Sequence, residues 1–214
     1  MKYDIVIFDM DGTILDTLDD LAGCLNTALE RNGLPRRTRE EVRRFVGNGI
    51  RKLVERGVPA GTDLSAIDKV YADFSENYRV HCADRTHPYN GIPDLIRALK
   101  RNGYKTAVVS NKADYAVQEL CARYFDGLFD LAVGEREGVR RKPAPDEIGQ
   151  VLKTLGCDSG KAVYVGDSEV DIETARNAGV PCISVDWGFR DRAALLKSGA
   201  SVIVSDTKEL LSQL

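Results

Sequence analysis

The amino-acid sequence predicts an α/β fold in which a parallel sheet carries helices on both faces and is interrupted by an all-helical insertion. Short apolar runs rich in β-branched residues alternate with helical patterns along most of the chain, which is typical of strands buried on both faces. One long stretch near the N-terminus shows helical periodicity without strands. The 214 residues, at roughly 150 residues per domain, fit one large domain or one domain with an insertion. We therefore expect a Rossmann-like core and a second, helical domain.

The apolar runs define the expected strands of the core. They lie near residues 5–8, 106–109, 128–133, 162–165, 183–185 and 202–204. Apolar residues spaced at i, i+3, i+4 and i+7 predict helices over residues 92–99 and 148–155. Prolines stand near the starts of these helices and glycines beyond their ends, at Pro93 and Pro145 and at Gly103 and Gly156. The alternation of strand and helix predicts a parallel sheet.

The helical insertion is expected to run from Thr17 to Cys82. The predicted domains are therefore a core formed by residues 1–16 and 83–214 and an inserted helical domain formed by residues 17–82. No Ser-rich or Pro-rich linker separates them, so the two connections are expected to be short.

Composition and charge exclude several classes of partner. Lys and Arg number 30 and Asp and Glu 33, giving a net charge of -3, so nucleic acid is not an expected partner. The apolar run at the N-terminus is too short for a signal peptide or a membrane span. The five cysteines are scattered and odd in number, which predicts reduced thiols. We expect a cytoplasmic protein without a membrane partner.

Polar residues follow the strands at the edge of the sheet where α/β proteins bind ligands. They are Asp9 and Asp11 after the first strand, Ser110 and Asn111 after the second, Lys142 after the third, and Asp167 and Asp171 after the fourth. Gly12, which follows Asp11, allows the chain to turn there. Each residue alone is typical of a turn or a helix cap. Several carboxylates at one edge, however, repel one another unless a cation binds, and their oxygens suit Mg²⁺. With a hydroxyl and a lysine nearby, the pattern predicts phosphoryl chemistry.

These motifs carry a family resemblance. Asp9-x-Asp11-Gly12-Thr13, Ser110, Lys142-Pro143 and Gly166-Asp167-Ser168 with Asp171 follow one another in the order of four family motifs. In this respect the sequence resembles the haloacid dehalogenase-like hydrolase superfamily, and within it the phosphoglycolate phosphatase-like branch. The resemblance covers nearly the whole chain, and the helical insertion resembles the mobile cap domain of that branch.

The resemblance implies a reaction through an aspartyl-phosphate. Asp9 would attack the phosphorus in line, and Asp11 would protonate the leaving alcohol and then take a proton from the attacking water. Ser110 and Lys142 would bind the phosphoryl oxygens. The dehalogenases of the family lack a carboxylate at the position of Asp11, so phosphate ester hydrolysis is the better match.

The resemblance also implies a magnesium site. The side chains of Asp9 and Asp167 and the backbone carbonyl of Asp11 would hold Mg²⁺, while Asp171 would orient water bound to the metal. Asn111 and the backbone at Gly12 are candidate substrate-binding groups, although a structural role explains both equally well.

The cap is expected to select the leaving group. In residues 46–52, two glycines precede a basic helical stretch, so Gly49 and Arg51 could present an amide and a guanidinium to a small anion such as a carboxylate. A joint between helices with a solvated basic face explains the segment equally well. The resemblance of this segment to its counterpart in phosphoglycolate phosphatases favours a small acidic phosphate ester.

The expected function is a Mg²⁺-dependent phosphatase, a hydrolase of phosphoric monoesters acting on a small phosphorylated metabolite, with 2-phosphoglycolate favoured over pyrophosphate and sugar phosphates. A phosphosugar mutase would use the same aspartyl-phosphate. A non-enzymatic module that accepts a phosphoryl group as a switch is a remoter alternative, against which the helical insertion and Asp11 both argue. We expect a monomer or a homodimer.

Overall fold

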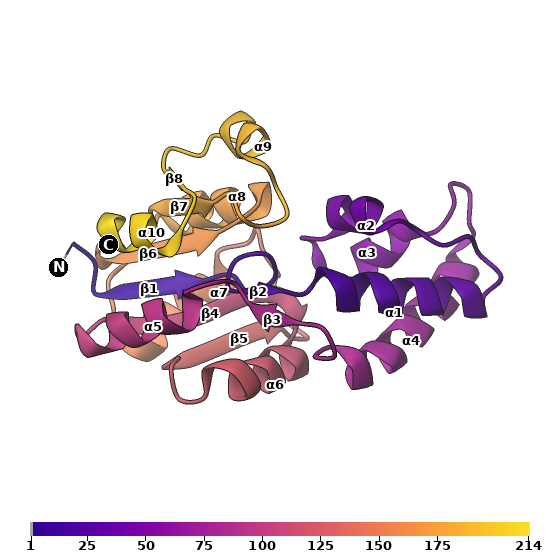
Figure 1. Cartoon of the computed structure of the whole chain (residues 1–214), viewed down its shortest axis with the longest axis horizontal. Helices are drawn as coiled ribbons and strands as arrows, with labels where there is room; N and C mark the ends of the chain where they lie inside the picture. The colour runs from indigo at the N-terminus through magenta and orange to yellow at the C-terminus, as the bar shows by residue number, and fades with distance from the viewer. Residues whose placement is uncertain (1) are drawn as a thin grey trace. The chain divides into compact units, whose positions relative to one another are not determined.

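The computed structural model describes residues 2–214 and divides the chain into two compact units. The first unit combines the residues up to Leu15 with Pro88–Leu214, and the second is Asp16–His87 (Figure 1). Met1, which the predicted core domain includes, lies outside the described residues. The first segment of the core unit ends at Leu15, one residue before the predicted end at residue 16. The helical unit ends at His87, five residues after the predicted end at residue 82.

The first unit is built on a six-stranded parallel sheet, which confirms the predicted α/β class. Its strands are β1 (Ile5–Phe8), β4 (Lys105–Ala113), β5 (Leu131–Glu135), β6 (Ala162–Gly166), β7 (Cys182–Val185) and β8 (Ile203–Val204), in the order β5-β4-β1-β6-β7-β8. In the centre of the sheet, Phe8 pairs with Val108 on one side and Val165 on the other. The carboxyl ends of β1, β4 and β6 therefore lie next to one another.

One predicted strand begins later than expected. The prediction placed a strand over residues 128–133, but β5 starts at Leu131. The preceding residues turn instead, because the N–H of Leu128 donates a hydrogen bond to the carbonyl of Phe125 across Gly127, which has a φ of 68°. Glycine tolerates this left-handed conformation, so the turn ends the preceding helix before the strand begins.

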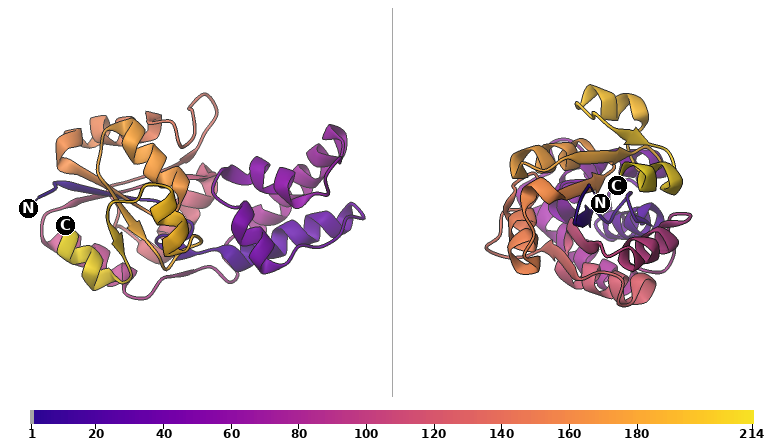
Figure 2. Two further views of the ribbon diagram at one scale, coloured as in Figure 1. Left: turned by 90° about the horizontal axis from the view of Figure 1, so that it is seen from above. Right: turned by 90° about the vertical axis from the view of Figure 1, so that its left-hand side faces the viewer.

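Helices cover both faces of this sheet, as Figure 2 shows. They are α5 (Ile92–Arg101), α6 (Asp114–Phe125), α7 (Asp146–Leu155), α8 (Glu169–Ala178), α9 (Arg192–Lys197) and α10 (Thr207–Gln213), with a short 3₁₀ helix at Ser159–Lys161. Alternate residues of β1 face opposite layers. Ile5 and Ile7 belong to a buried cluster with residues of α7 and α8, whereas Phe8 contacts Phe129, which in turn packs on Phe125 of α6.

The second unit contains four helices, α1 (Leu18–Arg31), α2 (Arg39–Phe45), α3 (Gly49–Gly57) and α4 (Leu64–His81). The rings of Phe74 and Tyr78 stack at a centroid distance of 5.3 Å and are fully buried, so these aromatic residues form core. The chain passes between the units through the short strands β2 (Leu15–Asp16) and β3 (His87–Pro88), which pair with each other.

The carboxylate of Asp20 explains why the second unit extends to His87. This buried side chain on α1 accepts hydrogen bonds from the N–H groups of Arg85 and Thr86 and from the Thr86 hydroxyl, at 2.7 to 3.0 Å. Residues 83–87 lack helical periodicity and looked like part of the core from sequence, but Asp20 fastens them to the helical unit.

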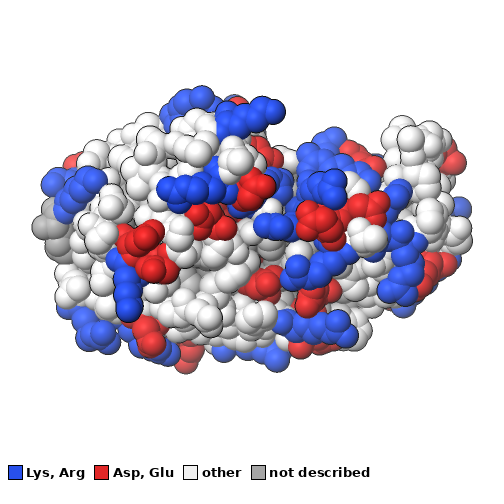
Figure 3. Space-filling view, turned by 45° about the horizontal axis from the view of Figure 1, so that its top comes forward, with Lys and Arg blue, Asp and Glu red and all other residues white. Residues whose placement is uncertain are grey.

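The described surface carries charges of both signs. Acidic and basic side chains are interspersed on the face drawn in Figure 3. In the second unit, Arg36 pairs with Glu30 and Arg39 with Asp19, and all four side chains are about half exposed. None of the helices described over residues 2–214 has the length and apolar character needed to cross a bilayer.

Candidate active site

The nucleophile candidate Asp9 follows β1 directly. Its N–H donates to the carbonyl of Val165 at 2.9 Å, which extends the pairing of β1 with β6 by one residue. Asp167 comes one residue after the end of β6, and Asp171 lies one turn further along, on α8. The parallel pairing of the two strands thus brings these residues to the same edge of the sheet.

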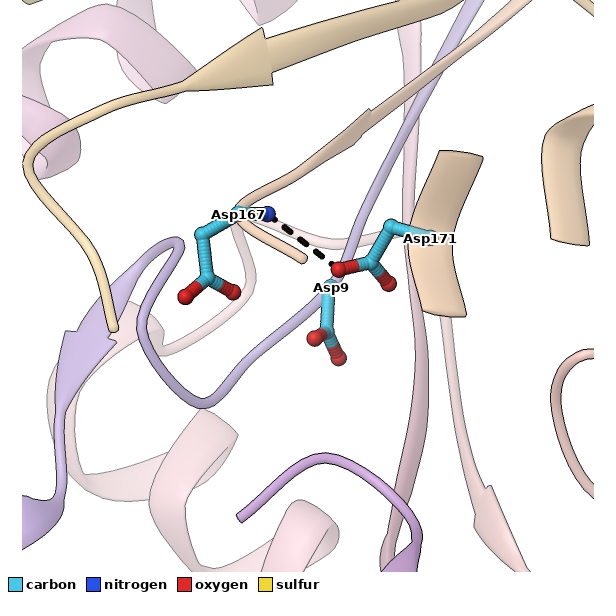
Figure 4. A group of neighbouring side chains, drawn as sticks. All are labelled: Asp9, Asp167 and Asp171. Carbon is cyan, nitrogen blue, oxygen red and sulfur yellow. Dashed lines mark hydrogen bonds between the residues drawn. The ribbon is translucent and has the colours of Figure 1, made fainter. Parts of the chain in front are cut away.

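The carboxylates of Asp9, Asp167 and Asp171 form one buried cluster (Figure 4). One oxygen from each residue lies within 4.8 Å of the others. The oxygens of Asp167 are fixed by two donors, the hydroxyl of Thr13 at 3.2 Å and the N–H of Phe189 at 2.7 Å. The negative charges of these buried carboxylates repel one another, and their oxygens are ligands that Mg²⁺ prefers. The cluster therefore fits a cation such as Mg²⁺.

Asp171 is oriented by the N-terminus of α8. Its Oδ2 accepts from the Ser168 hydroxyl at 2.6 Å, from the Ser168 N–H at 3.0 Å and from the Asp167 N–H at 3.2 Å. Ser168 caps the helix, and Asp171 closes the reciprocal capping box. Three donors on one oxygen leave Asp171 less able than Asp9 or Asp167 to turn toward a ligand.

Lys142 supplies the positive charge of the cluster. Its Nζ lies 2.9 Å from Asp9 Oδ1 and 2.8 Å from Asp171 Oδ1, and its side chain is 2% exposed. The third hydrogen of the ammonium goes to the hydroxyl of Tyr164 at 2.9 Å, and that hydroxyl donates to the carbonyl of Val109. The structure thus adds Tyr164 to the predicted residues. In the sequence this tyrosine looks like one more core residue of a buried strand.

Burial and charge set the ionisation of the cluster. Burial, reinforced by the negative charges of Asp171 and Asp11 and opposed by Lys142, raises the pKa of Asp9 to about 7. Burial and the neighbouring carboxylates likewise raise the pKa of Asp167 well above its usual range. Burial opposes the charge of Lys142, but Asp171 and Asp9 hold its pKa well above the ordinary value. One ammonium among three carboxylates leaves excess negative charge, which a divalent cation would balance.

The remaining predicted residues of the core lie around this cluster. Asp11 pairs with Lys112, whose Nζ lies 2.8 Å from Asp11 Oδ1. Ser110 is buried near the carboxyl end of β4. The Asn111 amide donates to the carbonyl of Lys142 at 3.0 Å, a contact that ties two of the predicted motifs together.

Gly12 has a packing role that the sequence did not reveal. Its N–H donates to the carbonyl of Leu15 at 2.9 Å, so this amide already has a partner within the loop. Its φ is 84°, and a Cβ at this position would lie 2.3 Å from Asp167 Oδ2. Gly188 also lies against this side chain, since a Cβ there would lie 2.5 Å from Asp167 Oδ2. Glycines thus allow two loops to close on Asp167.

The two residues predicted to bind substrate from the helical unit lie on α3. Gly49 is its first residue and has a φ of 82°. Arg51 donates to Glu55 at 3.1 Å and pairs with Asp68 of α4, so within this unit its guanidinium holds two helices together. Binding of a substrate carboxylate by Arg51 remains a prediction and would require Arg51 to exchange one of these partners.

Comparison with known proteins gives the family. The chain belongs to the haloacid dehalogenase-like hydrolases, whose family model matches residues 6–185. Within that family it falls in the phosphoglycolate phosphatase-like branch and is a phosphatase.

Individual relatives support the same assignment. The chain is 34% identical over 198 residues to the phosphoglycolate phosphatase of Mesorhizobium japonicum, covering 90% of this chain and 86% of that one. It is 32% identical to the N-acetylmuramic acid 6-phosphate phosphatase of Pseudomonas aeruginosa, covering 100% and 96%. A crystal structure from Lactobacillus delbrueckii, of a protein provisionally named phosphoglycolate phosphatase, has a TM-score of 0.95 at 42% identity, covering 100% of this chain and 98% of that one.

A further buried carboxyl group, Glu147 on α7, gives a prediction for stability. Its side chain is almost completely buried, and neither carboxylate oxygen has a hydrogen-bond partner among the described residues. Burial raises its pKa from 4.5 to about 7, although Lys142 and Arg136 oppose the shift. Between pH 4.5 and about pH 7, Glu147 loses its proton in the unfolded chain but keeps it in the folded protein. Stability should therefore fall as pH rises through this window.

We expect Glu147→Gln to be more stable than the wild type at pH 8, by about 2 kcal/mol, and to differ little from it at pH 5. Urea unfolding at the two pH values measures the difference. The matched control is Glu173→Gln on α8, whose side chain is exposed and whose replacement should change stability by no more than about 0.5 kcal/mol at either pH. An equal effect of Glu147→Gln at both pH values would contradict the assignment.

Proposed function

We propose that this phosphatase is Mg²⁺-dependent and hydrolyses a small phosphorylated metabolite, with 2-phosphoglycolate the leading candidate, through an aspartyl-phosphate on Asp9. The observation that carries the proposal is the placement of the Asp9 carboxylate, buried at the end of β1 and 2.9 Å from the Lys142 ammonium. A carboxylate beside a fixed cation, at the sheet edge where α/β proteins bind ligands, is suited to attack a phosphoryl group.

In the first step a carboxylate oxygen of Asp9 forms a bond to phosphorus as the bond from phosphorus to the ester oxygen breaks. Asp11, two residues along the same loop, gives its proton to the departing oxygen. In the second step water attacks the phosphorus, Asp11 takes a proton from that water, and Asp9 is released with inorganic phosphate. The residues named account for every proton transferred.

Positive charge and hydrogen-bond donors stabilise the transferring phosphoryl group. Lys142, fixed by Asp171 and Tyr164, is placed to balance charge on Asp9 and on the phosphoryl oxygens. Ser110 is proposed to donate from the end of β4. The amide of Asn111 is used to hold the Lys142 backbone, so we assign it to positioning that loop.

Asp9 and Asp167, with the backbone carbonyl of Asp11, are the groups that would hold Mg²⁺. When bound, the ion would supply positive charge that favours the ionised, attacking form of Asp9 and neutralises the phosphoryl oxygens. Asp171, whose oxygens already accept from Lys142 and from the start of α8, would act by orienting its neighbours.

A second candidate substrate is a sugar 6-phosphate. The similarity to the N-acetylmuramic acid 6-phosphate phosphatase extends over 100% of this chain at 32% identity, close to the 34% found for a phosphoglycolate phosphatase. Both esters carry a carboxylate on the leaving group. The two candidates therefore differ mainly in the size of the group that the helical unit must accommodate.

The experiment is phosphate release from 2-phosphoglycolate, N-acetylmuramic acid 6-phosphate, glucose 6-phosphate, pyrophosphate and p-nitrophenyl phosphate, with Mg²⁺ and with a chelator. We expect the highest kcat/KM for 2-phosphoglycolate, loss of release in chelator and recovery when Mg²⁺ is restored. A preference for the muramic acid ester would favour the second candidate. Release that persists in chelator, or no release from any ester, would contradict the proposal. Transfer of phosphoryl within the sugar pool would instead identify a mutase.

A further inference from the structure

Lys112, next to the candidate acid-base Asp11, has no role in the mechanism above. Its Nζ lies 2.8 Å from Asp11 Oδ1, and its side chain is 1% exposed, against 15% for that of Asp11. The pair therefore has a buried cation and a carboxyl group that remains partly accessible. Among the described residues, Lys112 is the cation paired with Asp11, whereas Lys142 pairs with Asp9 and Asp171.

The fold fixes the backbone that carries Lys112. Near its carboxyl end β4 departs from regular pairing with β5, because the three residues of β4 between Val109 and Ala113 oppose a single residue of β5, Gly134. Such an irregularity redirects side chains at the end of a strand. Gly134 of β5 permits it, since a Cβ there would lie 2.6 Å from the Lys112 carbonyl oxygen. The Gly134 N–H also donates to the Asp114 carboxylate at 2.8 Å, which secures the start of α6.

The chemistry of the ammonium restricts where Asp11 can carry a proton. A lysine ammonium donates hydrogen bonds and accepts none. In a neutral carboxyl group the carbonyl oxygen is a better acceptor than the hydroxyl oxygen, so the contact favours Asp11 Oδ1 as the oxygen without a proton. When Asp11 is neutral, its proton lies on Oδ2. Lys112 thus defines which of the two oxygens exchanges protons.

We propose that Lys112 is a positioning residue which holds Asp11 Oδ1 and so directs Oδ2, the oxygen that carries the proton, toward the leaving group. The inference rests on the proposed function, because it assigns a partner to the acid-base of that reaction. In the first step a carboxylate oxygen of Asp9 bonds to phosphorus as the ester bond to phosphorus breaks. The proton on Asp11 Oδ2 passes to the departing oxygen, and Asp11 Oδ1 keeps its hydrogen bond to the ammonium. No proton leaves Lys112.

Leaving groups of different basicity provide the test. An alkoxide departs slowly without a proton, whereas p-nitrophenolate is a stable anion that needs none. The value of kcat/KM reports the steps up to departure of the leaving group, so hydrolysis of the aspartyl-phosphate does not affect it. We compare the alkyl ester hydrolysed fastest in the panel above with p-nitrophenyl phosphate.

The variant is Lys112→Met, which keeps the aliphatic chain and removes the charge. We expect kcat/KM for the alkyl ester to fall about 100-fold, within the range of acid-base contributions, and that for p-nitrophenyl phosphate to change less than about threefold. Lys105→Met, at the opposite end of β4 and exposed, is the matched control and should leave both values unchanged. Equal losses on the two substrates, or no loss on either, would overturn the proposal.

A double variant separates a role through Asp11 from an independent one. In the Asp11→Asn background the proton is already missing, so adding Lys112→Met should lower kcat/KM for the alkyl ester by no more than about threefold. A second loss as large as the first would overturn the proposal. Lys112→Gln, with thermal unfolding of each variant, provides a second replacement should methionine prevent folding. If the wild type hydrolyses no ester, the proposed function fails, and that outcome is distinct from any result with Lys112.

Discussion

We expect Asp9→Asn to abolish phosphate release while the protein stays folded. The substitution keeps the shape of the side chain but replaces the attacking carboxylate by an amide, and we expect a loss on the order of 10⁴-fold or more in kcat. Because burial raises the pKa of Asp9 to about 7, the ionised carboxylate opposes folding of the metal-free protein as pH rises from about 4 to about 7. The variant should therefore be at least as stable as the wild type at pH 8.

Phosphate release, urea unfolding in chelator and mass spectrometry of acid-quenched reactions measure these effects. The wild type should carry a phosphoryl adduct on the peptide that contains Asp9, and the variant should carry none. Asp94→Asn on α5, whose side chain is 88% exposed, is the matched control and should retain full activity. Turnover by Asp9→Asn at more than a few per cent of the wild-type rate would show that another group is the nucleophile.

Lys142→Met should destabilise the fold and inactivate the enzyme together. The buried ammonium lies within 2.9 Å of carboxylate oxygens of both Asp9 and Asp171, and these would lose their counter-charge. Leaving one partner of a buried ion pair uncompensated costs about 3–5 kcal/mol. Loss of a fixed charge beside the transferring phosphoryl should lower kcat by about 10²- to 10³-fold. Urea unfolding and phosphate release measure the two effects.

A second substitution distinguishes the two roles of Lys142. Adding Asp171→Asn removes one of the uncompensated carboxylates, so the double variant should regain part of the lost stability without regaining activity. Lys153→Met, exposed on α7, should change stability by no more than about 0.5 kcal/mol. If Lys142→Met were as stable as this control, the ion pairs would not hold the site together in the way the geometry indicates.

The sequence predicted the sheet and the clustering of Asp9 and Asp167 for one physical reason. Parallel strands end at a common edge, so polar residues that directly follow apolar runs must meet there. The same reasoning applies to any strand whose apolar run is clear. This reasoning misplaced the start of β5. Leu128 and Phe129 extend the apolar pattern toward the N-terminus, but the chain turns at Gly127 and the strand begins only at Leu131.

The residues that the sequence did not reveal act through tertiary contacts. Tyr164 lies in a strand whose sequence pattern is typical of core residues, yet its hydroxyl accepts a hydrogen bond from Lys142. Lys112 lies near the end of β4 and Lys142 follows β5, and residue type alone gives no means of assigning one to Asp11 and the other to Asp9. Asp20 looks like an ordinary acidic residue in the first turn of α1, but it accepts a hydrogen bond from Thr86, 66 residues further along the chain. Spacing along the chain does not encode such contacts.

The paired strands β2 and β3 have an evolutionary consequence. The inserted unit leaves and rejoins the sheet through neighbouring strands, and Asp20 fastens its last residues to its own first helix. The residues of the charged cluster, Asp9, Lys142, Asp167 and Asp171, all lie outside Asp16–His87. Mutations can therefore accumulate in the inserted unit, and lengths of chain can be gained or lost there, without altering the groups that we propose carry the reaction. A lineage can diversify in the esters that it accepts while it inherits one chemistry.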